Sequence, residues 1–313
     1  MNASIVTIIT NEQKIITTKE SSVPRINRTV LMSDALHFSA EQAINPYYSD
    51  PLVNQSVASE EHQSIVQALT DAGVAIERIP SPTDSQDGVY TANWALVRGD
   101  TAILARLPDV RKAEEAYAEQ VLTSLGKNVI RVPDGLKFSG QGDALACGNY
   151  LFCGQGYRSD LAAQVFATET LGYERIQLQT VPELDEHGVP MKNAVSGWND
   201  SFFYDIDLAL SIIKAPGENE RGLIAYCPAA FTPESQAILA NFDAVDKIEI
   251  SIEEAQHAFA GNLVSTGETV IMSAYAPLLR ASLESHGITV ITPEISELAK
   301  GGGYIRCTSL TLD

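Results

Sequence analysis

The chain has 313 residues, of which 45% are hydrophobic and 19% are charged, and its formal net charge is −19. This composition is typical of a soluble globular protein with a sizeable core, and so acidic a surface argues against partners such as nucleic acid or an anionic membrane. No stretch reaches the roughly 18 unbroken apolar residues of a membrane span, and Met1 to Thr10 lack the basic region of a signal peptide. Four cysteines without metal-type spacing indicate reduced thiols, so we expect a cytoplasmic protein with no metal or other cofactor.

The beginning of the chain predicts a lead-in followed by alternating strand and helix. Residues 11–28 are polar and show little periodicity, so we expect residues 1–28 to be a loose lead-in to a single domain of residues 29–313. The first strand is predicted to begin at Val30. A helix is predicted over Ser59 to Ala72, because its apolar residues recur at helical spacing and a glycine follows.

A hairpin that opens on a polar residue then recurs along the chain. The first copy covers Asn93 to Ala105 and the second covers Asp143 to Cys153. Looser copies open at Asp207 and Asn262, and a fifth begins at Cys307, where we expect the N-terminal strand to complete it. The opening positions lie roughly 45 to 65 residues apart, which is long enough for one compact unit each.

Amphipathic helices follow the copies, and a strand closes each unit. The predicted helices cover Arg111 to Leu125, Asp160 to Leu171, Pro233 to Ala240 and Ala276 to Ser285. Asp160 and Thr232 are the expected N-caps. Since no such unit buries an apolar face alone, we predict an α/β fold in which five units form a pseudo-fivefold propeller. The opening residues would then converge on a central channel; an ordinary α/β sheet with coincidental spacing is the alternative.

The chain ends in a glycine-rich loop that runs into a cysteine. Gly301 to Gly303 permit positive φ angles and a close approach to a ligand, and Cys307 follows where the loop becomes a predicted strand. A thiol at such a junction is placed to react, whereas a flexible tail with a buried packing cysteine is the alternative. Cys147, Cys153 and Cys227 lie within apolar strand patterns and are expected in the core.

Five segments, in order, resemble motifs of the guanidine-modifying superfamily, which includes dimethylarginine dimethylaminohydrolase, arginine deiminase and the amidinotransferases. The resemblance extends from Val30 to Asp313. The segments are Val89-Tyr90-Thr91-Ala92-Asn93, Phe138-Ser139-Gly140-Gln141-Gly142-Asp143, Gly156-Tyr157-Arg158-Ser159-Asp160, Tyr204-Asp205-Ile206-Asp207 and Gly301-Gly302-Gly303-Tyr304-Ile305-Arg306-Cys307. Their counterparts include Phe-Glu-Gly-x-Gly-Asp for the second segment and Tyr-His-Leu-Asp for the fourth.

The resemblance implies a cysteine enzyme with two departures in its catalytic set. Cys307 matches the attacking thiol, but Asp205 stands at the position of the superfamily's histidine and Ser139 at that of its glutamate. Asp205 and Ser139 are therefore the noncanonical candidates for catalysis beside Cys307. Substitutes for the histidine are sought at His187 and His37, although a solvated loop histidine is the default for both.

Four further residues are candidates for substrate binding. By resemblance Arg158 faces the substrate, and a guanidinium can hold a carboxylate in a bidentate fork; a surface arginine is the alternative. Asp143, Asp207 and Asn93 are expected to hold a cationic substrate or to orient its neighbours, and the alternative for them is strand-end capping. We also expect the segment 174–200 to form a lid that carries Trp198, and the acidic pair at 253 and 254 to be a solvated helix start.

The expected chemistry is thiolate attack on a guanidinium carbon. The attack gives a tetrahedral adduct that expels an amine and leaves a covalent thiouronium for water or an amine to resolve. The thiol needs a lowered pKa, which an ionised Asp205 beside it would oppose. One hypothesis is therefore an enzyme that catalyses hydrolysis or amidino transfer on arginine or a related amino acid. This hypothesis includes an enzyme whose substrate carries a simple amine instead. The other is an inactive member that binds an amino acid or a protein partner, and a homo-oligomer stays open in both.

Overall fold

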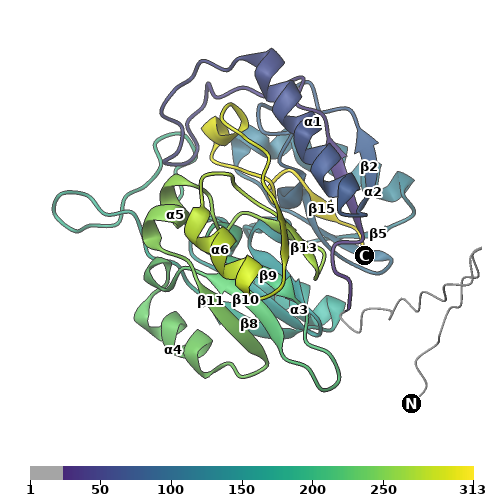
Figure 1. Ribbon diagram of the computed structural model, residues 1–313. Helices are drawn as coiled ribbons and strands as arrows, with labels where there is room; N and C mark the ends of the chain where they lie inside the picture. Colours follow the sequence, from purple (N-terminus) through teal and green to yellow (C-terminus); the bar gives the residue numbers. More distant parts are fainter. Residues whose placement is uncertain (1–23) are drawn as a thin grey trace, which may run out of the picture.

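The computed structural model describes residues 24–313, so most of the expected lead-in, residues 1–23, lies outside the described residues. Within the described part, no helix has the length and apolar character that crossing a membrane requires. The chain forms five separate three-stranded sheets with helices on their outer sides (Figure 1).

All five sheets have the same design: the middle strand pairs antiparallel with one neighbour and parallel with the other. In sheet order the strands are β3 (Ala95–Arg98), β4 (Thr101–Leu104), β5 (Asn128–Arg131); β6 (Ala144–Cys147), β7 (Tyr150–Gly154), β8 (Glu174–Leu178); β9 (Leu210–Lys214), β10 (Gly222–Tyr226), β11 (Val245–Glu249); β12 (Val264–Ser265), β13 (Thr269–Ile271), β14 (Thr289–Ile291); and β15 (Leu310–Thr311), β1 (Thr29–Ser33), β2 (Ala75–Ile79). The predicted repeat is thus confirmed as five sheets, whereas their closure around a central channel stays a prediction.

The fifth sheet joins the two ends of the described chain, as the sequence predicted. Leu31 pairs with Leu310 in the antiparallel ladder between β1 and β15. The Asp313 carboxylate then accepts a hydrogen bond from the backbone N–H of Thr29 at 2.9 Å. This pairing holds the turn that carries Cys307 against the rest of the molecule.

One helix connects the middle strand to the parallel strand in each sheet, and a short extra helix follows β11. The helices are α1 (Gln55–Asp71), α2 (Lys112–Ser124), α3 (Leu161–Leu171), α4 (Pro233–Asn241), α5 (Ile252–His257) and α6 (Pro277–Ser285). The predicted Thr232 cap is confirmed, because its hydroxyl accepts from the backbone of Ser235. Asp160 is the N-cap residue of α3, as predicted, but its side chain makes no capping hydrogen bond, because the carboxylate accepts from the backbone N–H of Lys137 at 2.8 Å.

The polar residues that open the hairpins do not belong to the strands, contrary to the prediction. Asn93 and Asp207 lie in single 3₁₀ turns, Thr91–Trp94 and Ile206–Leu208, and Asp143 directly follows a third turn. The physical reason is visible at Gly140, whose φ of 57° bends the chain before β6 and whose missing Cβ leaves room for the backbone of β3. Similarly, turn hydrogen bonds delay the last strand, so that Cys307 precedes β15.

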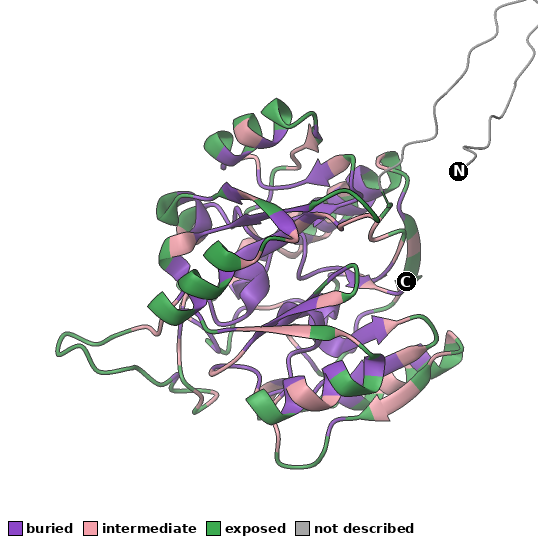
Figure 2. Ribbon diagram, turned by 90° about the horizontal axis from the view of Figure 1, so that it is seen from below, coloured by how far each residue is buried: buried purple, intermediate pink, exposed green. Residues whose placement is uncertain are grey.

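Buried residues fill the interior, and exposed residues lie on the outer helix faces and on one projecting hairpin (Figure 2). Cys147, Cys153 and Cys227 are buried, as predicted. Glu254 departs from the expected solvated helix start, since it is buried and its carboxylate accepts the backbone N–H groups of Leu278 and Leu279 at the start of α6.

Candidate functional site

Cys307 follows the glycine-rich loop just before β15 and is 2% exposed. Its thiol donates to Asp207 Oδ2 at 3.5 Å and accepts from Asn262 Nδ2 at 3.2 Å. Asn262 also accepts the backbone N–H of Cys307 through Oδ1 at 3.1 Å. One amide side chain therefore fixes both the thiol and its backbone, and the turn before β12 supplies it.

Asp205 lies with Asn93 and Ser139 in a second group of buried side chains. Asn93 Nδ2 donates to Asp205 Oδ2 at 2.7 Å and to the Ser139 hydroxyl at 2.9 Å. All three residues are at most 3% exposed. Glycine is needed at 142, because a Cβ there would meet both Asn93 and Asp205. The two residues that depart from the superfamily pattern thus share one hydrogen-bond donor.

Three buried carboxyl groups in this region each have an oxygen without a hydrogen-bond partner. These atoms are Asp143 Oδ2, Asp205 Oδ1 and Asp207 Oδ1. The second oxygen of Asp143 accepts from the backbone N–H of Ile206 at 3.0 Å. Buried polar atoms nearly always have partners, so three unpartnered acceptors in neighbouring groups are a feature that requires a ligand or protons.

Burial and mutual repulsion govern the charge of these groups. Burial, followed by the charge of Asp205, raises the pKa of Asp143 to about 8. The same two causes raise the pKa of Asp207 well above its ordinary value, and burial raises that of Asp205. Burial and the charge of Asp207 also raise the pKa of the Cys307 thiol well above its ordinary value. Burial and mutual repulsion therefore favour protonated carboxyl groups and a neutral thiol.

Arg158 is buried, so the alternative interpretation of a surface arginine is wrong. Its Nη2 donates to the carbonyl oxygen of Ile44 at 2.8 Å, and its guanidinium lies 4.4 Å from the ring centre of Tyr204. Its positive charge also opposes the raised pKa values of Asp143 and Asp205. The structure therefore brings the arginine to the same buried region as the carboxyl groups.

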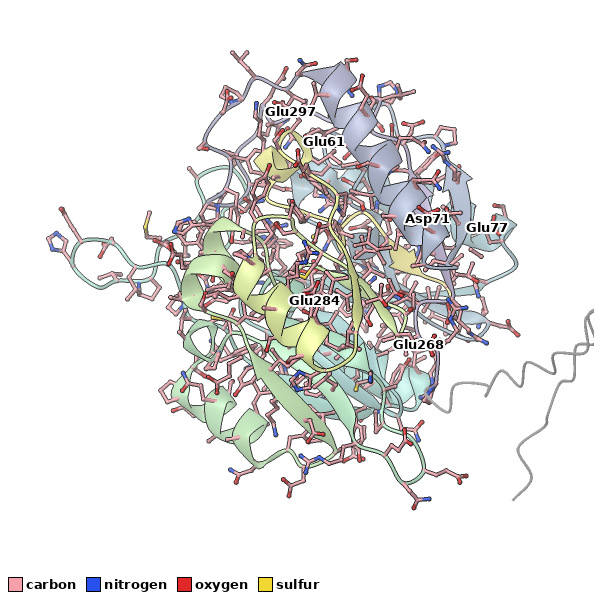
Figure 3. All side chains as sticks on the ribbon, viewed as in Figure 1. Glu61, Asp71, Glu77, Glu268, Glu284 and Glu297 are labelled. Atoms are coloured by element: carbon pink, nitrogen blue, oxygen red, sulfur yellow. The ribbon has the colours of Figure 1, made fainter. Side chains whose placement is uncertain are left out.

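The segment 35–53, between β1 and α1, is hydrogen-bonded to the rim of this region. Asn45 Nδ2 donates to the carbonyl oxygen of Gly301 at 3.0 Å, and Asn193 donates to that of Ala43. Tyr47 packs its ring 4.6 Å from that of Phe259, and its hydroxyl is buried without a partner. At the end of the molecule where Glu61 and Glu297 lie (Figure 3), Glu297 accepts the backbone N–H of Asn54, the cap of α1.

The structure does not bring the histidine candidates to Cys307. His187 is on the projecting hairpin with its side chain 77% exposed, and His37 is exposed after β1. The expected lid segment contributes β8 to the second sheet and then forms this hairpin. Trp198 packs under the ammonium of Lys137, 5.1 Å from the ring centre, so its part in a lid stays a prediction.

Sequence reasoning missed two residues that organise the site. Asn262 was named only as a hairpin opening, although its position in that series indicated a place beside Cys307. Arg111 was predicted merely as a helix start, but it is 2% exposed and donates to Asn93 Oδ1 at 2.9 Å. Nothing in its local pattern distinguishes it from a solvated arginine. Among the described residues, no group of three or more His, Cys, Asp or Glu side chains is arranged to hold a metal ion.

Known proteins resemble the chain over most of its described length. The relatives include the bifunctional arginine dihydrolase/ornithine cyclodeaminase AgrE of Nostoc, 29% identical over 90% of this chain but only 37% of its own length, which is less than half. The N(G),N(G)-dimethylarginine dimethylaminohydrolase of Mycobacterium tuberculosis is 28% identical over 92% of this chain and 87% of its own length.

A solved structure shares the fold. The substrate-bound N-terminal domain of ArgZ, a cyanobacterial arginine dihydrolase, matches with a TM-score of 0.77 at 25% identity, over 90% of this chain and 97% of that one. In addition, residues 36–193 match the model of the family described as N,N dimethylarginine dimethylhydrolase, eukaryotic. The chain therefore belongs to the N,N dimethylarginine dimethylhydrolase family and, with it, to the guanidine-modifying superfamily.

Proposed function

We propose that this protein is a cysteine-dependent enzyme that acts on the guanidino or amidino group of arginine or a related amino acid. The observation that carries the proposal is the set of three unpartnered carboxyl oxygens, on Asp143, Asp205 and Asp207, next to Cys307. In this proposal the five sheets close as a propeller, and the channel at its centre holds the reacting group. The relatives named above act on guanidino compounds, which supports the reaction type.

A guanidinium fits the carboxyl groups by charge and by hydrogen-bond count. It presents only N–H donors in a plane, and each unpartnered carboxyl oxygen is an acceptor. Its positive charge favours ionised Asp143 and Asp207 and a Cys307 thiolate, so it opposes the burial that raises their pKa values. Arg158 would exchange its bond to the carbonyl of Ile44 for the substrate carboxylate.

The proposed reaction begins with attack of the Cys307 thiolate on the guanidinium carbon. The thiol passes its proton to the Asp207 carboxylate that accepts its hydrogen bond, and Asn262 Nδ2 stabilises the resulting thiolate. The released amine carries off the proton from Asp207 as an ammonium ion, after the C–N bond breaks with transfer of a second proton to the leaving nitrogen. Asp205 supplies this proton from its protonated carboxyl group, because its raised pKa suits a general acid. Ser139 and Asn93 hold that carboxyl group in place. Water then resolves the thiouronium; an amine acceptor would make the enzyme an amidinotransferase.

The test is intact-protein mass spectrometry after brief mixing with arginine, dimethylarginine and related amidines. We expect a covalent adduct on the unchanged protein and none on the Cys307→Ser variant, with product amine or ammonia and a urea in the supernatant. The adduct mass identifies the transferred group. Absence of both adduct and product with every compound would overturn the proposal.

A specific observation favours a second function, the binding of an amino acid without turnover. None of the five histidines is among the hydrogen-bond partners of Cys307, and burial raises the pKa of its thiol. Calorimetry distinguishes the enzyme from the binding protein, because a binding protein would retain the ligand unchanged and show no heat of reaction. The cytoplasmic location and the homo-oligomer stay predictions from the sequence.

A further inference from the structure

A cavity of about 320 Å³ runs along the first strands of three hairpins. At its inner end it is lined by Gln141 and Asp207, and at its outer end by the hairpin-turn residues Arg98 and Gly148. The segment 35–53 contributes none of its lining residues. One water molecule needs roughly 10–15 Å³ of such space, so the cavity has room for several water molecules. It connects the exposed hairpin turns to the candidate site along a separate route.

Asp207 forms the wall between this cavity and the thiol. Its Oδ2 lies 3.5 Å from Cys307 Sγ, and its other oxygen has no hydrogen-bond partner. Arg306 lines the cavity beside it and is held by Gln141 at 2.8 Å and by the carbonyl oxygen of Ser309 at 2.7 Å. A carboxyl group thus borders both the route from the solvent and the sulfur atom, with a fixed guanidinium nearby.

We propose that this cavity is the entrance for the hydrolytic water, and that Asp207 is the base that activates this water. The inference rests on the proposed function, since it concerns the second half of that reaction. It also explains how the chain resolves an intermediate without a histidine beside Cys307. The segment 35–53, held by the hydrogen bond from Asn45 to Gly301, can then stay in place while water arrives from the hairpin turns.

The proposed hydrolysis of the Cys307 thiouronium conserves atoms and charge. The Asp207 carboxylate takes one proton from the water, and the resulting hydroxide oxygen bonds to the thiouronium carbon. The tetrahedral intermediate collapses with cleavage of the C–S bond, and its hydroxyl proton passes to Asp205, which the first half of the reaction left ionised. A urea product and the Cys307 thiolate remain. Asp207 then returns its proton to that thiolate, so the free enzyme regains its starting state without any oxidant or reductant.

The experiment narrows the cavity at a residue outside the catalytic groups. Ala146 lines the cavity and is exposed on β6, so Ala146→Trp obstructs the route without entering the core. Glu174→Trp, at an exposed position at the start of β8 in the same sheet, is the matched control. Rapid-mixing mass spectrometry with arginine measures the formation and the decay of the Cys307 adduct. We expect Ala146→Trp to form the adduct within twofold of the normal rate and to slow its decay at least tenfold.

The Asp207→Asn variant tests the role of Asp207 as the base separately from the role of the cavity as the water entrance. We expect its adduct to decay at least a hundredfold more slowly, and added hydroxylamine, which needs no base, to restore decay in this variant but not in Ala146→Trp. Normal decay in Ala146→Trp, or its rescue by hydroxylamine, would overturn the water entrance while leaving the proposed function intact. If the unchanged protein forms no adduct and no product, the proposed function itself fails and this inference fails with it.

Discussion

Two clusters of buried charge meet at Asn93, and they differ in whether their groups have partners. In one, Arg111 donates to Glu114 at 2.7 Å and lies 3.9 Å from Asp87, and every group has an opposite charge. In the other, three carboxyl groups have unpartnered oxygens. Since both are almost completely buried, burial alone does not distinguish a structural cluster from a site. The three neighbouring carboxyl oxygens without partners do, and in the proposed function a cationic ligand supplies those partners.

The largest expected effect comes from breaking the paired cluster. Arg111→Met leaves Glu114 and Asp87 buried without a cation, and we expect the free energy of unfolding to fall by about 3–5 kcal/mol. Urea denaturation measures the loss. The control is Arg131→Met, which breaks an exposed ion pair with Glu119 and should cost at most about 1 kcal/mol. Equal losses in the two variants would show that the buried pairing is not structural.

The unpartnered cluster should respond in its ligand affinity rather than in its stability. Asp143→Asn keeps an acceptor for the backbone of Ile206 but cannot ionise, so we expect unchanged stability within about 1 kcal/mol near pH 4, where the folded protein also holds Asp143 protonated. In a Cys307→Ser background, its affinity for L-arginine should fall by about 1.5–3 kcal/mol, measured by calorimetry. Asp160→Asn, outside the cluster, should bind normally; equal weakening there would contradict a specific cation site.

The smallest expected effect, per pH unit, is a change in the free energy of unfolding with pH. The folded pKa of Asp143 is about 8 against an ordinary 3.8, so between these values the folded chain holds a proton that the unfolded chain has released. Stability should therefore fall as pH rises through this window, by at most about 1.4 kcal/mol per pH unit from this group, and level off above it. Urea denaturation at several pH values measures the slope, which Asp143→Asn should reduce. An unaltered slope would contradict the raised pKa.

The repeating units were predictable because their signals are local. Strand, turn and helix patterns depend on neighbouring residues, so the five hairpins and most helices appear within a few residues of their predicted positions. The exceptions are also local: Asn93 and Asp207 lie in 3₁₀ turns, which have no hydrophobic period of their own. Asp160 occupies the expected N-cap position, but its side chain does not cap the helix, because its carboxylate accepts a hydrogen bond from Lys137, a residue distant in sequence.

By itself, the sequence determined the repeated α/β unit, the closure of the fifth sheet by the N-terminal strand, and the polar residues that precede each hairpin. Only the tertiary structure decided that Asn262 holds the thiol, that Arg111 is buried behind Asn93, and that three carboxyl groups have oxygens without partners. The physical reason is that these facts depend on contacts between residues up to about a hundred positions apart, such as Cys307 with Asp207. Local patterns select the elements, whereas only their packing determines which buried charges find a partner.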